Sequence, residues 1–223
     1  MAAPMKLFYS GLAAVAVVGV GMIWLARSRG AERAAPQAVP PAIGAAFEGS
    51  VMGSDSAPVT VVEYADFECP ACAQFAVLTA PDIKQRLVAT GKVRWVFRDL
   101  PLDGHLNSLP AHHAGQCAGE QGRFFEMHDQ LYFNHGRWVT DRRPERRFRE
   151  FARAIGLDLG RYDDCMSSNR YMARLRQSRL DAAAAGVSST PTFDIGTQRI
   201  SGALLYDEFK RLVDQAAAGT SAQ

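Results

Sequence analysis

Two cysteines separated by two residues stand at a point where the sequence changes from a strand pattern to a helix pattern. The segment VTVVEYADFECPACAQF covers residues 59–75, and its first six residues are mostly apolar or β-branched on both alternating sides. This composition is typical of a strand that is buried on both faces. Cys69 and Cys72 follow an acidic turn and begin the helix. Any fold for this chain must therefore place both sulfurs where a central strand passes into a helix.

The remaining patterns extend this unit into a complete plan. Residues 93–100, VRWVFRDL, predict a second buried strand, and the helix before them is expected to bend near Pro81 and end at Gly91. A strand–helix–strand unit of this kind seeds a parallel sheet. Helical patterns fill the insertion that follows, at about residues 105–186. Two strands come next, at 191–196 and 199–202, and an amphipathic helix comes last, at 205–218. The sequence predicts an α/β fold of the plan βαβ–ββα, with an all-helical insertion between the second and third core strands.

The N-terminal part of the chain does not have the pattern of a globular domain. Residues 7–26 form an uncharged apolar run of 20 residues. A helix of that length spans roughly 30 Å, about the hydrocarbon thickness of a bilayer. We favour a transmembrane anchor within residues 1–26 over the alternative, a cleaved signal peptide. Residues 27–46 are rich in Ala and Pro and are expected to form an extended linker, which leaves residues 47–223 as the folded domain.

The charge pattern gives no case for nucleic-acid binding. Four of the 25 basic residues and one of the 23 acidic residues precede residue 47, so the rest of the chain carries a net charge of −1. A near-neutral domain lacks the excess of positive charge that attracts a polyanion. Seven arginines lie between Arg137 and Arg153. We interpret them as a solvated helix surface with pairs such as Glu145 with Arg149, rather than as a docking face for anionic lipid headgroups.

The spacing of Cys69 and Cys72 favours a redox-active pair over two other kinds of site. A zinc ribbon needs a second Cys or His pair at short spacing, and neither Cys117 nor Cys165 has such a neighbour. The five histidines of the insertion show no metal-binding spacing, so we expect no metal. A purely structural disulfide is disfavoured because so short a loop removes little entropy from the unfolded chain.

The two sulfurs are expected to differ in reactivity. Cys69 lies at a helix N-terminus, where unpaired backbone N–H groups and the helix dipole stabilise an anion. This position lowers the pKa of Cys69 and makes it the attacking or leaving sulfur. Cys72 lies one turn deeper, and we expect it to be more buried and less nucleophilic.

The other two cysteines, Cys117 and Cys165, lie on separate predicted helices of the insertion. A bridge between them would stabilise the folded state by about 4 kcal/mol, because in the chain-entropy model closing the loop lowers the entropy of the unfolded chain. Such a structural disulfide requires an oxidising compartment. Two buried free thiols are the alternative. We favour the bridge, and it places the domain outside the membrane although the arginines after the apolar run favour the opposite orientation.

Taken together, the strand followed by DFECPAC, the helical insertion and the late segment GVSSTPTFDIG resemble the DsbA-like thiol–disulfide oxidoreductases of the thioredoxin superfamily. The similarity covers residues 47–218. It implies a thioredoxin-like fold, with catalytic roles for Cys69 and Cys72. It also implies a cis peptide bond before Pro191, and a substrate-binding role for Thr190 and Pro191 beside the sulfurs. Some anchored members of the family have a bridge like the one expected between the other two cysteines.

The chain departs from the best-known periplasmic oxidant of that family at the dipeptide between the cysteines. Here it is Pro70-Ala71, where that protein has Pro-His. The histidine is thought to stabilise the reduced thiolate. Its absence, together with Thr190 before the proline, predicts a pair that is less oxidising than the strong periplasmic oxidant.

Two acidic residues just before the cysteines also predict a less oxidising pair. Asp66 and Glu68 are expected to raise the pKa of Cys69, because a nearby negative charge disfavours a thiolate. For Glu68 we also expect either a solvated surface position or a role in moving a proton to or from Cys72.

These features predict an extracytoplasmic thiol–disulfide oxidoreductase, tethered by its N-terminal helix to the periplasmic or cell-envelope face of the inner or plasma membrane. It is expected to need no cofactor. Its expected partners are cysteine-containing protein substrates and a membrane redox partner that restores the active-site disulfide. We favour the oxidising direction. The alternatives are a disulfide reductase or isomerase, or a non-catalytic thioredoxin-like module that binds a metal or a partner protein.

Overall fold

The computed structural model describes residues 37–38 and 49–220. The predicted anchor and most of the predicted linker lie outside these residues. None of the helices in the described ranges is long and apolar enough to cross a membrane.

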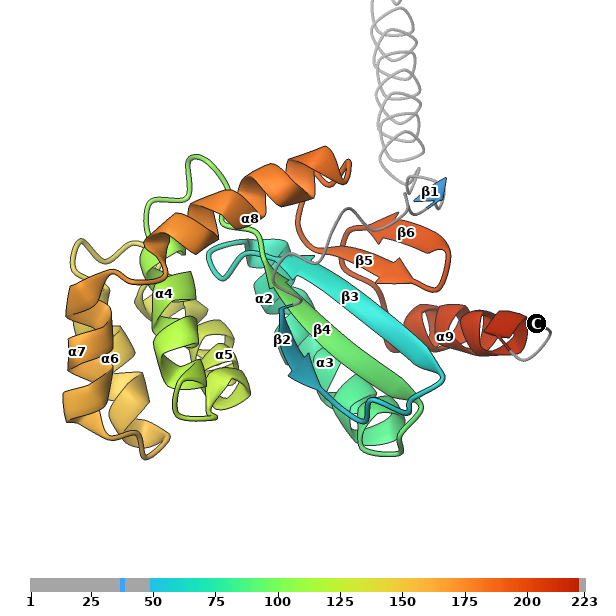
Figure 1. Cartoon of the computed structure of the whole chain (residues 1–223), viewed down its shortest axis with the longest axis horizontal. Helices are drawn as coiled ribbons and strands as arrows, with labels where there is room; N and C mark the ends of the chain where they lie inside the picture. The colour runs from blue at the N-terminus through green and yellow to red at the C-terminus, as the bar shows by residue number, and fades with distance from the viewer. Residues whose placement is uncertain (1–36, 39–48, 221–223) are drawn as a thin grey trace, which may run out of the picture. The chain divides into compact units, whose positions relative to one another are not determined.

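Within the described residues, six strands form one mixed sheet in the order β1-β6-β5-β3-β4-β2 (Figure 1). The strands are β1 (Gln37–Ala38), β2 (Ser50–Met52), β3 (Val59–Ala65), β4 (Val93–Asp99), β5 (Thr192–Ile195) and β6 (Gln198–Ser201). The central pair β3 and β4 is parallel, with Val59 opposite Val93, whereas the other neighbours are antiparallel. The four core strands agree with the predicted βαβ–ββα plan.

Two short edge strands were not predicted from the sequence. β2 pairs with β4, and β1 pairs with β6 through Gln37 opposite Arg199. β1 falls inside the segment predicted to be an extended linker, and its two residues pair with the edge of the sheet. Strands of two or three residues carry no periodic pattern, because their pairing depends on a neighbour that is distant in sequence.

The predicted helix between β3 and β4 is divided as expected. It consists of α2 (Pro70–Leu78), α3 (Ala80–Ile83) and the π-helical turn η1 (Lys84–Val88). The break lies at Thr79, two residues before Pro81, which has no N–H to continue the hydrogen-bond ladder. The chain then reverses at Gly91, whose φ of +72° is favourable for glycine.

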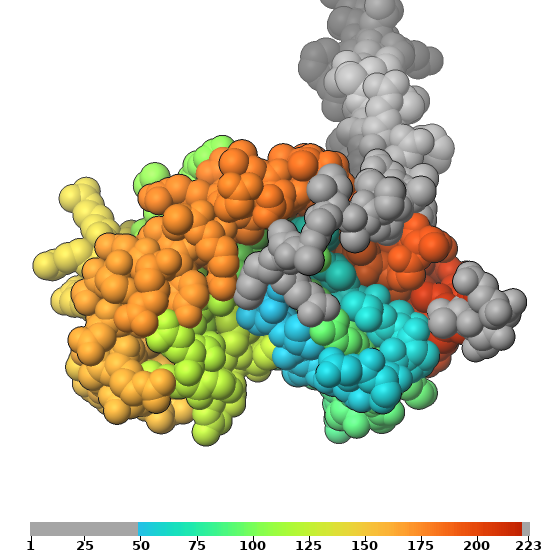
Figure 2. Space-filling view, in the orientation of Figure 1, coloured from blue at the N-terminus to red at the C-terminus, as the bar shows by residue number. Residues whose placement is uncertain are grey.

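The insertion contains helices, as predicted, with no strand among its described residues. Its helices are α4 (Ser108–Gly119), α5 (Phe124–Phe133), the 3₁₀ turn η2 (His135–Arg137), α6 (Glu145–Ala154), α7 (Leu159–Ser168) and α8 (Met172–Ala184). In Figure 1 helices α4 to α7 lie to the left of the sheet, α8 crosses above it, and the C-terminal helix α9 (Tyr206–Thr220) lies to the right. Figure 2 shows the insertion, green to orange, beside the part that contains the sheet and α9.

Two hydrophobic cores meet along α2. Cys72 and Ala76 belong to the core that is built with the insertion helices, whereas Phe75 belongs to the core of the sheet, α3 and α9. Burying both faces of a short helix in this way fixes its position against the sheet. The insertion therefore supplies the surroundings of the inner cysteine.

Candidate active site

The outer cysteine lies at the start of α2, as the sequence predicted. Cys69 is the residue before the helix, with an extended backbone (φ −70°, ψ 122°), and Pro70 takes the first helical turn, where a missing N–H costs nothing. The Cys69 N–H donates to the carbonyl of Asp66 at 3.1 Å. The backbone N–H groups of Ala71 and Cys72 face the Cys69 sulfur and help to lower its pKa. Local backbone geometry thus prepares this sulfur to carry a negative charge.

The two sulfurs differ in burial and in acidity. Both are free thiols, and the residues Cys69 and Cys72 are 8% and 0% exposed. The hydrogen bond from the Cys72 thiol is the largest influence on Cys69, and it lowers the pKa of Cys69 to about 5 although burial acts in the opposite sense. Burial, and next the bond to Cys69, raise the pKa of Cys72 well above its ordinary value. At neutral pH the outer sulfur is a thiolate and the inner one a thiol.

The segment before β5 completes the surroundings of Cys69. β5 pairs with β3, with Thr192 opposite Tyr64, and the preceding peptide bond, Thr190–Pro191, is cis, as the resemblance implied. Cys69 Sγ lies 3.5 Å from the Thr190 carbonyl oxygen, to which it donates only while it is protonated. Among the described residues the buried Thr190 hydroxyl has no partner apart from Cys69, and it lowers the pKa of Cys69. This hydroxyl can donate to the sulfur once Cys69 is ionised.

Asp66 was expected to oppose the thiolate, yet the pKa of Cys69 is lowered, and the Asp66 carboxylate is engaged by several polar groups. Asp66 is fully buried and accepts hydrogen bonds from the Leu102 N–H at 2.8 Å and the Ser108 hydroxyl at 2.6 Å. It also accepts from the Glu68 N–H at 2.9 Å and lies 2.7 Å from His105 Nδ1 and 3.6 Å from His112 Nε2. Burial alone would raise the pKa of Asp66, but these contacts hold it well below its usual range.

Glu68 is half-buried and has a structural role that was not predicted, while its predicted part in proton transfer stays a prediction. Its carboxylate accepts a hydrogen bond from the Asn107 N–H at 2.7 Å, and its backbone carbonyl lies 2.9 Å from His135 Nε2. Glu68 therefore joins the loop before Cys69 to the start of α4 and to η2. This role could not be read from the sequence, because both partners lie in the insertion.

A buried ionic network behind the loop also comes from the insertion. His112 is completely buried, and its Nδ1 lies 2.6 Å from Asp99 Oδ1 at the end of β4. Burial acts to lower the pKa of His112, but Asp66 and Asp99 raise it to about 9. Gln116 donates to the second oxygen of Asp99 at 2.7 Å. Since removing one member of a buried ion pair is costly, this network holds the loop against α4.

Glu63 is a site residue that the sequence analysis did not find. It lies on β3, is 1% exposed, and accepts a hydrogen bond from Trp95 Nε1 at 3.0 Å. Burial raises the pKa of Glu63 to about 8, and its charge is among the influences that raise the pKa of Cys72. The available signal was an acidic residue within an otherwise apolar strand. A titrating carboxyl near the inner sulfur is well suited to proton exchange.

The remaining cysteines form a disulfide. Cys117 on α4 and Cys165 on α7 are bonded, and both are buried. His113 lies next to them, with Nε2 3.7 Å from the Cys117 sulfur. The three side chains place their ligand atoms within 4.8 Å of one another. The sulfurs are engaged in the disulfide, however, so they are not thiolate ligands for a metal.

Comparison with known proteins gives the family. The model of a family described as Thioredoxin matches residues 46–215. The chain belongs to this thioredoxin family. The match covers the folded domain, including the two active-site cysteines and the segment around Pro191.

Solved structures show the same architecture. The fold is similar to that of oxidised BdbD from Bacillus subtilis, with a TM-score of 0.72 and 21% identity, over 82% of this chain and 100% of that one. It is also similar to the thiol-disulfide exchange protein alpha-DsbA2 from Wolbachia pipientis, with a TM-score of 0.63 and 25% identity, over 74% and 85% of the two chains. These similarities confirm the thioredoxin-like fold with a helical insertion.

The alignments with two sequence relatives each cover only part of the two proteins. A Na(+)/H(+) antiporter, NhaA 1 of Salinispora arenicola, is 37% identical over 171 residues, which make up 76% of this chain and 25% of the antiporter. A probable disulfide bond formation protein D of Bacillus cereus is 35% identical over 96 residues, or 40% of this chain and 44% of that protein. The chain therefore spans about a quarter of the first relative and under half of the second.

Proposed function

We propose that this protein is a thiol–disulfide oxidoreductase that exchanges disulfides with cysteine-containing proteins and works mainly as an oxidase. The observation that carries the proposal is the asymmetry of the pair: the pKa of Cys69 is lowered to about 5, whereas the pKa of buried Cys72 is raised. A thiolate with a low pKa is a good leaving group, and stabilising it favours the reduced enzyme. Both effects drive the transfer of a disulfide to a substrate.

In the first step the disulfide form of the enzyme is attacked by a substrate thiolate. A bond forms between the substrate sulfur and Cys69, the Cys69–Cys72 bond breaks, and Cys72 leaves with the electron pair. The leaving sulfur lies in the buried core, where a thiolate is unfavourable. Protonated Glu63, whose pKa is about 8, supplies the proton and becomes a carboxylate.

In the second step another thiolate of the substrate attacks the substrate sulfur of the mixed disulfide. The new bond is the substrate disulfide, and Cys69 leaves as a thiolate that its surroundings stabilise. The substrate has lost two electrons and the enzyme has gained them. A membrane redox partner in its oxidised form then restores the Cys69–Cys72 disulfide and accepts those electrons.

The names of the relatives and the second disulfide support this role and its compartment. One relative is a probable disulfide bond formation protein, and one similar structure is a thiol-disulfide exchange protein. Structural disulfides such as Cys117–Cys165 persist in oxidising compartments. We therefore place the domain on the extracytoplasmic side, tethered by the apolar segment 7–26, with Thr190 and Pro191 in contact with the substrate chain.

Trapping tests the exchange itself. With Cys72→Ala, the mixed disulfide through Cys69 has no resolving thiol, so adducts with a reduced, unfolded cysteine protein are expected to accumulate. Non-reducing electrophoresis at pH 8 measures them, because loss of the Cys72 hydrogen bond raises the pKa of Cys69. Cys69→Ala is the matched control and should form none. If Cys72→Ala forms no adducts and metal co-purifies with the protein, the chain is a non-catalytic binding module.

The reduction potential of the pair tests the direction. In thioredoxin the reactive cysteine has a pKa near 7 and the cysteine pair has a reduction potential of roughly −270 mV. In DsbA the corresponding values are a pKa near 3.5 and a potential of roughly −120 mV. A Cys69 pKa of about 5 lies between them, so we expect roughly −150 to −220 mV. Equilibration with glutathione buffers measures this value. A potential below roughly −250 mV would assign the protein to disulfide reduction, and one equal to the strong oxidant would contradict the argument from Ala71 and Thr190.

A further inference from the structure

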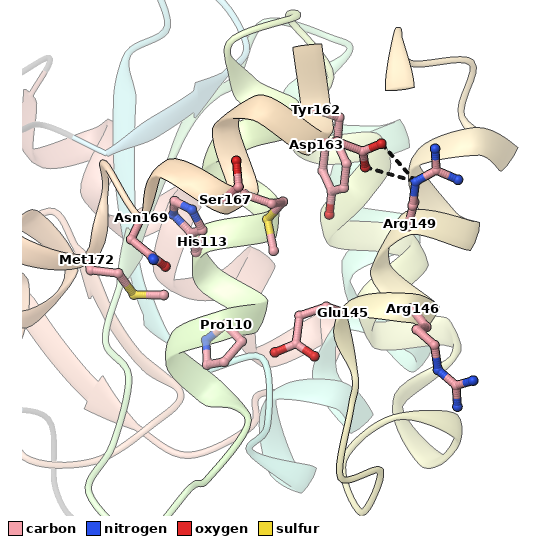
Figure 3. Close-up of a pocket in the computed structure, with 11 residues that line it drawn as sticks. Pro110, His113, Glu145, Arg146, Arg149, Tyr162, Asp163, Ser167, Asn169 and Met172 are labelled. Carbon is pink, nitrogen blue, oxygen red and sulfur yellow. Dashed lines mark hydrogen bonds and ion pairs between the residues drawn. The ribbon is translucent and has the colours of Figure 1, made fainter. Parts of the chain in front are cut away.

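The helical insertion contains a cavity that the proposed chemistry does not use. Its volume is about 400 Å³, within the usual range of small-molecule sites, and residues of α4, α6, α7 and α8 line it (Figure 3). None of the residues assigned to the active site is among them. On α4, Ser108 and His112 contact the active-site network, whereas Pro110 and His113 line the cavity.

Two buried polar atoms in the cavity wall have no hydrogen-bond partner among the described residues. They are the Tyr162 hydroxyl and His113 Nδ1, on side chains of residues that are 1% and 0% exposed. In Figure 3 the Tyr162 hydroxyl points toward the space between His113 and Glu145. Because buried polar atoms are almost always paired, two such atoms in one cavity indicate a missing partner.

The protonation state of each group defines the partner that it needs. His113 Nε2 lies 3.2 Å from the carbonyl oxygen of Cys165, which can only accept, so Nε2 carries the hydrogen. Burial lowers the pKa of His113, which leaves a neutral ring with a lone pair on Nδ1. Burial, and then the charges of Asp163 and Glu145, raise the pKa of Tyr162, which stays a neutral phenol. The wall therefore offers one acceptor and one hydroxyl that can donate or accept.

Two arginines and two carboxylates line the cavity, and among the described residues the Glu145 carboxylate has no ion-pair partner. Arg149 pairs with Asp163 at 2.9 and 3.0 Å, not with Glu145 as the sequence analysis expected. The Glu145 carboxylate makes no hydrogen bond or ion pair within the described part of the chain. In Figure 3 its carboxylate points toward the cavity, whereas the guanidinium of Arg146 points away. A ligand with a positive charge would give the Glu145 carboxylate a partner.

We propose that the cavity binds a small aromatic primary amine. Its ammonium group lies between the Glu145 carboxylate and the Tyr162 hydroxyl, and a ring hydroxyl donates to His113 Nδ1. The apolar walls suit an aromatic body, because thioether sulfurs make favourable contacts with rings; these walls are formed by Pro110, Met166 and Met172. The proposal is independent of disulfide exchange.

Three probes of similar shape separate the contribution of the ammonium group to binding from that of the ring hydroxyl. Tyramine has both polar ends, 2-phenylethylamine lacks the hydroxyl, and tyrosol has an alcohol in place of the ammonium. Calorimetric titration of the full chain in neutral detergent is expected to show saturable tyramine binding. Affinity should be about fivefold weaker for 2-phenylethylamine and about tenfold weaker for tyrosol, as expected for the loss of one neutral and one charged hydrogen bond.

Variants connect the binding to the cavity. Glu145→Gln is expected to weaken tyramine about tenfold and to remove its advantage over tyrosol. Tyr162→Phe, which loses a hydroxyl without a protein partner, should fold normally and weaken tyramine about fivefold. Asp164→Asn is the control, since it removes a charge from the same helix outside the cavity. Absence of saturable binding of all three probes up to about 10 mM, or tyramine affinity unchanged by Glu145→Gln, overturns the proposal.

Discussion

Alkylation of reduced protein by iodoacetamide is expected to show a thiolate at Cys69 that titrates near pH 5. The thiol's ordinary pKa of 9.0 is lowered to about 5, first by the hydrogen bond from Cys72 and also by Thr190 and the helix N–H groups. At pH 6 about 90% of Cys69 is then ionised, against about 0.1% of an ordinary thiol. The rate at which the Cys69 peptide gains mass, measured between pH 4 and pH 9, gives the midpoint directly.

A matched pair of variants assigns the cause of this low pKa. Cys72→Ser keeps a hydrogen-bond donor beside Cys69 and should leave the midpoint low, whereas Cys72→Ala removes the donor and should raise it. Thr190→Val removes a weaker donor and should raise the midpoint by less. Equal midpoints for the serine and alanine variants would show that Cys72 is not the main source of stabilisation. A wild-type midpoint near pH 9 would remove the basis of the proposed oxidase.

The Glu63→Gln variant is expected to be more stable than the parent by about 3 kcal/mol at pH 7. Burial raises the pKa of Glu63 from 4.5 to about 8. Between these values the folded state keeps a proton that the unfolded state releases, so the stability of the parent falls as pH rises. Glutamine does not ionise, and its side-chain carbonyl can still accept from Trp95 Nε1.

The pH dependence of the stability gain of Glu63→Gln separates the loss of a titrating carboxyl from ordinary repacking. Urea unfolding from pH 5 to pH 8 should show a gain below about 1 kcal/mol at pH 5 that grows steadily with pH. A background of Cys69→Ser with Cys72→Ser keeps the Cys117–Cys165 disulfide intact without added reductant. A gain that is the same at every pH would mean that Glu63 ionises normally. It would then be unsuited to supply the proton to Cys72.

Some of the site followed from local patterns. The buried strand, the acidic turn and the CPAC segment placed Cys69 at a helix start and Cys72 one turn deeper. The greater burial of Cys72 in the structure agrees with this prediction. These features depend on residues that are close in sequence, because helix N-termini and strand burial are set by local periodicity and capping.

Other parts of the site were misjudged because they depend on distant residues. Asp66 and Glu68 look like free charges beside Cys69 in the sequence. In the fold, however, Asp66 meets His105 and His112, and Glu68 accepts from the Asn107 N–H. The effect of a carboxylate on a neighbouring pKa depends on what else it contacts. The sign of that effect was therefore outside the reach of a single sequence.

By itself, the sequence determined the order of strands and helices, the reactive cysteine pair and its orientation on a helix N-terminus. The tertiary structure decided how acidic Cys69 is, which carboxyl influences the pKa of Cys72, and which polar groups of the insertion lack a partner among the described residues. The physical reason is that periodicity reports which side of an element is buried, whereas a pKa or a cavity depends on the atoms that other segments bring to that side. Glu63, Thr190 and Tyr162 gain their chemical roles only through such contacts.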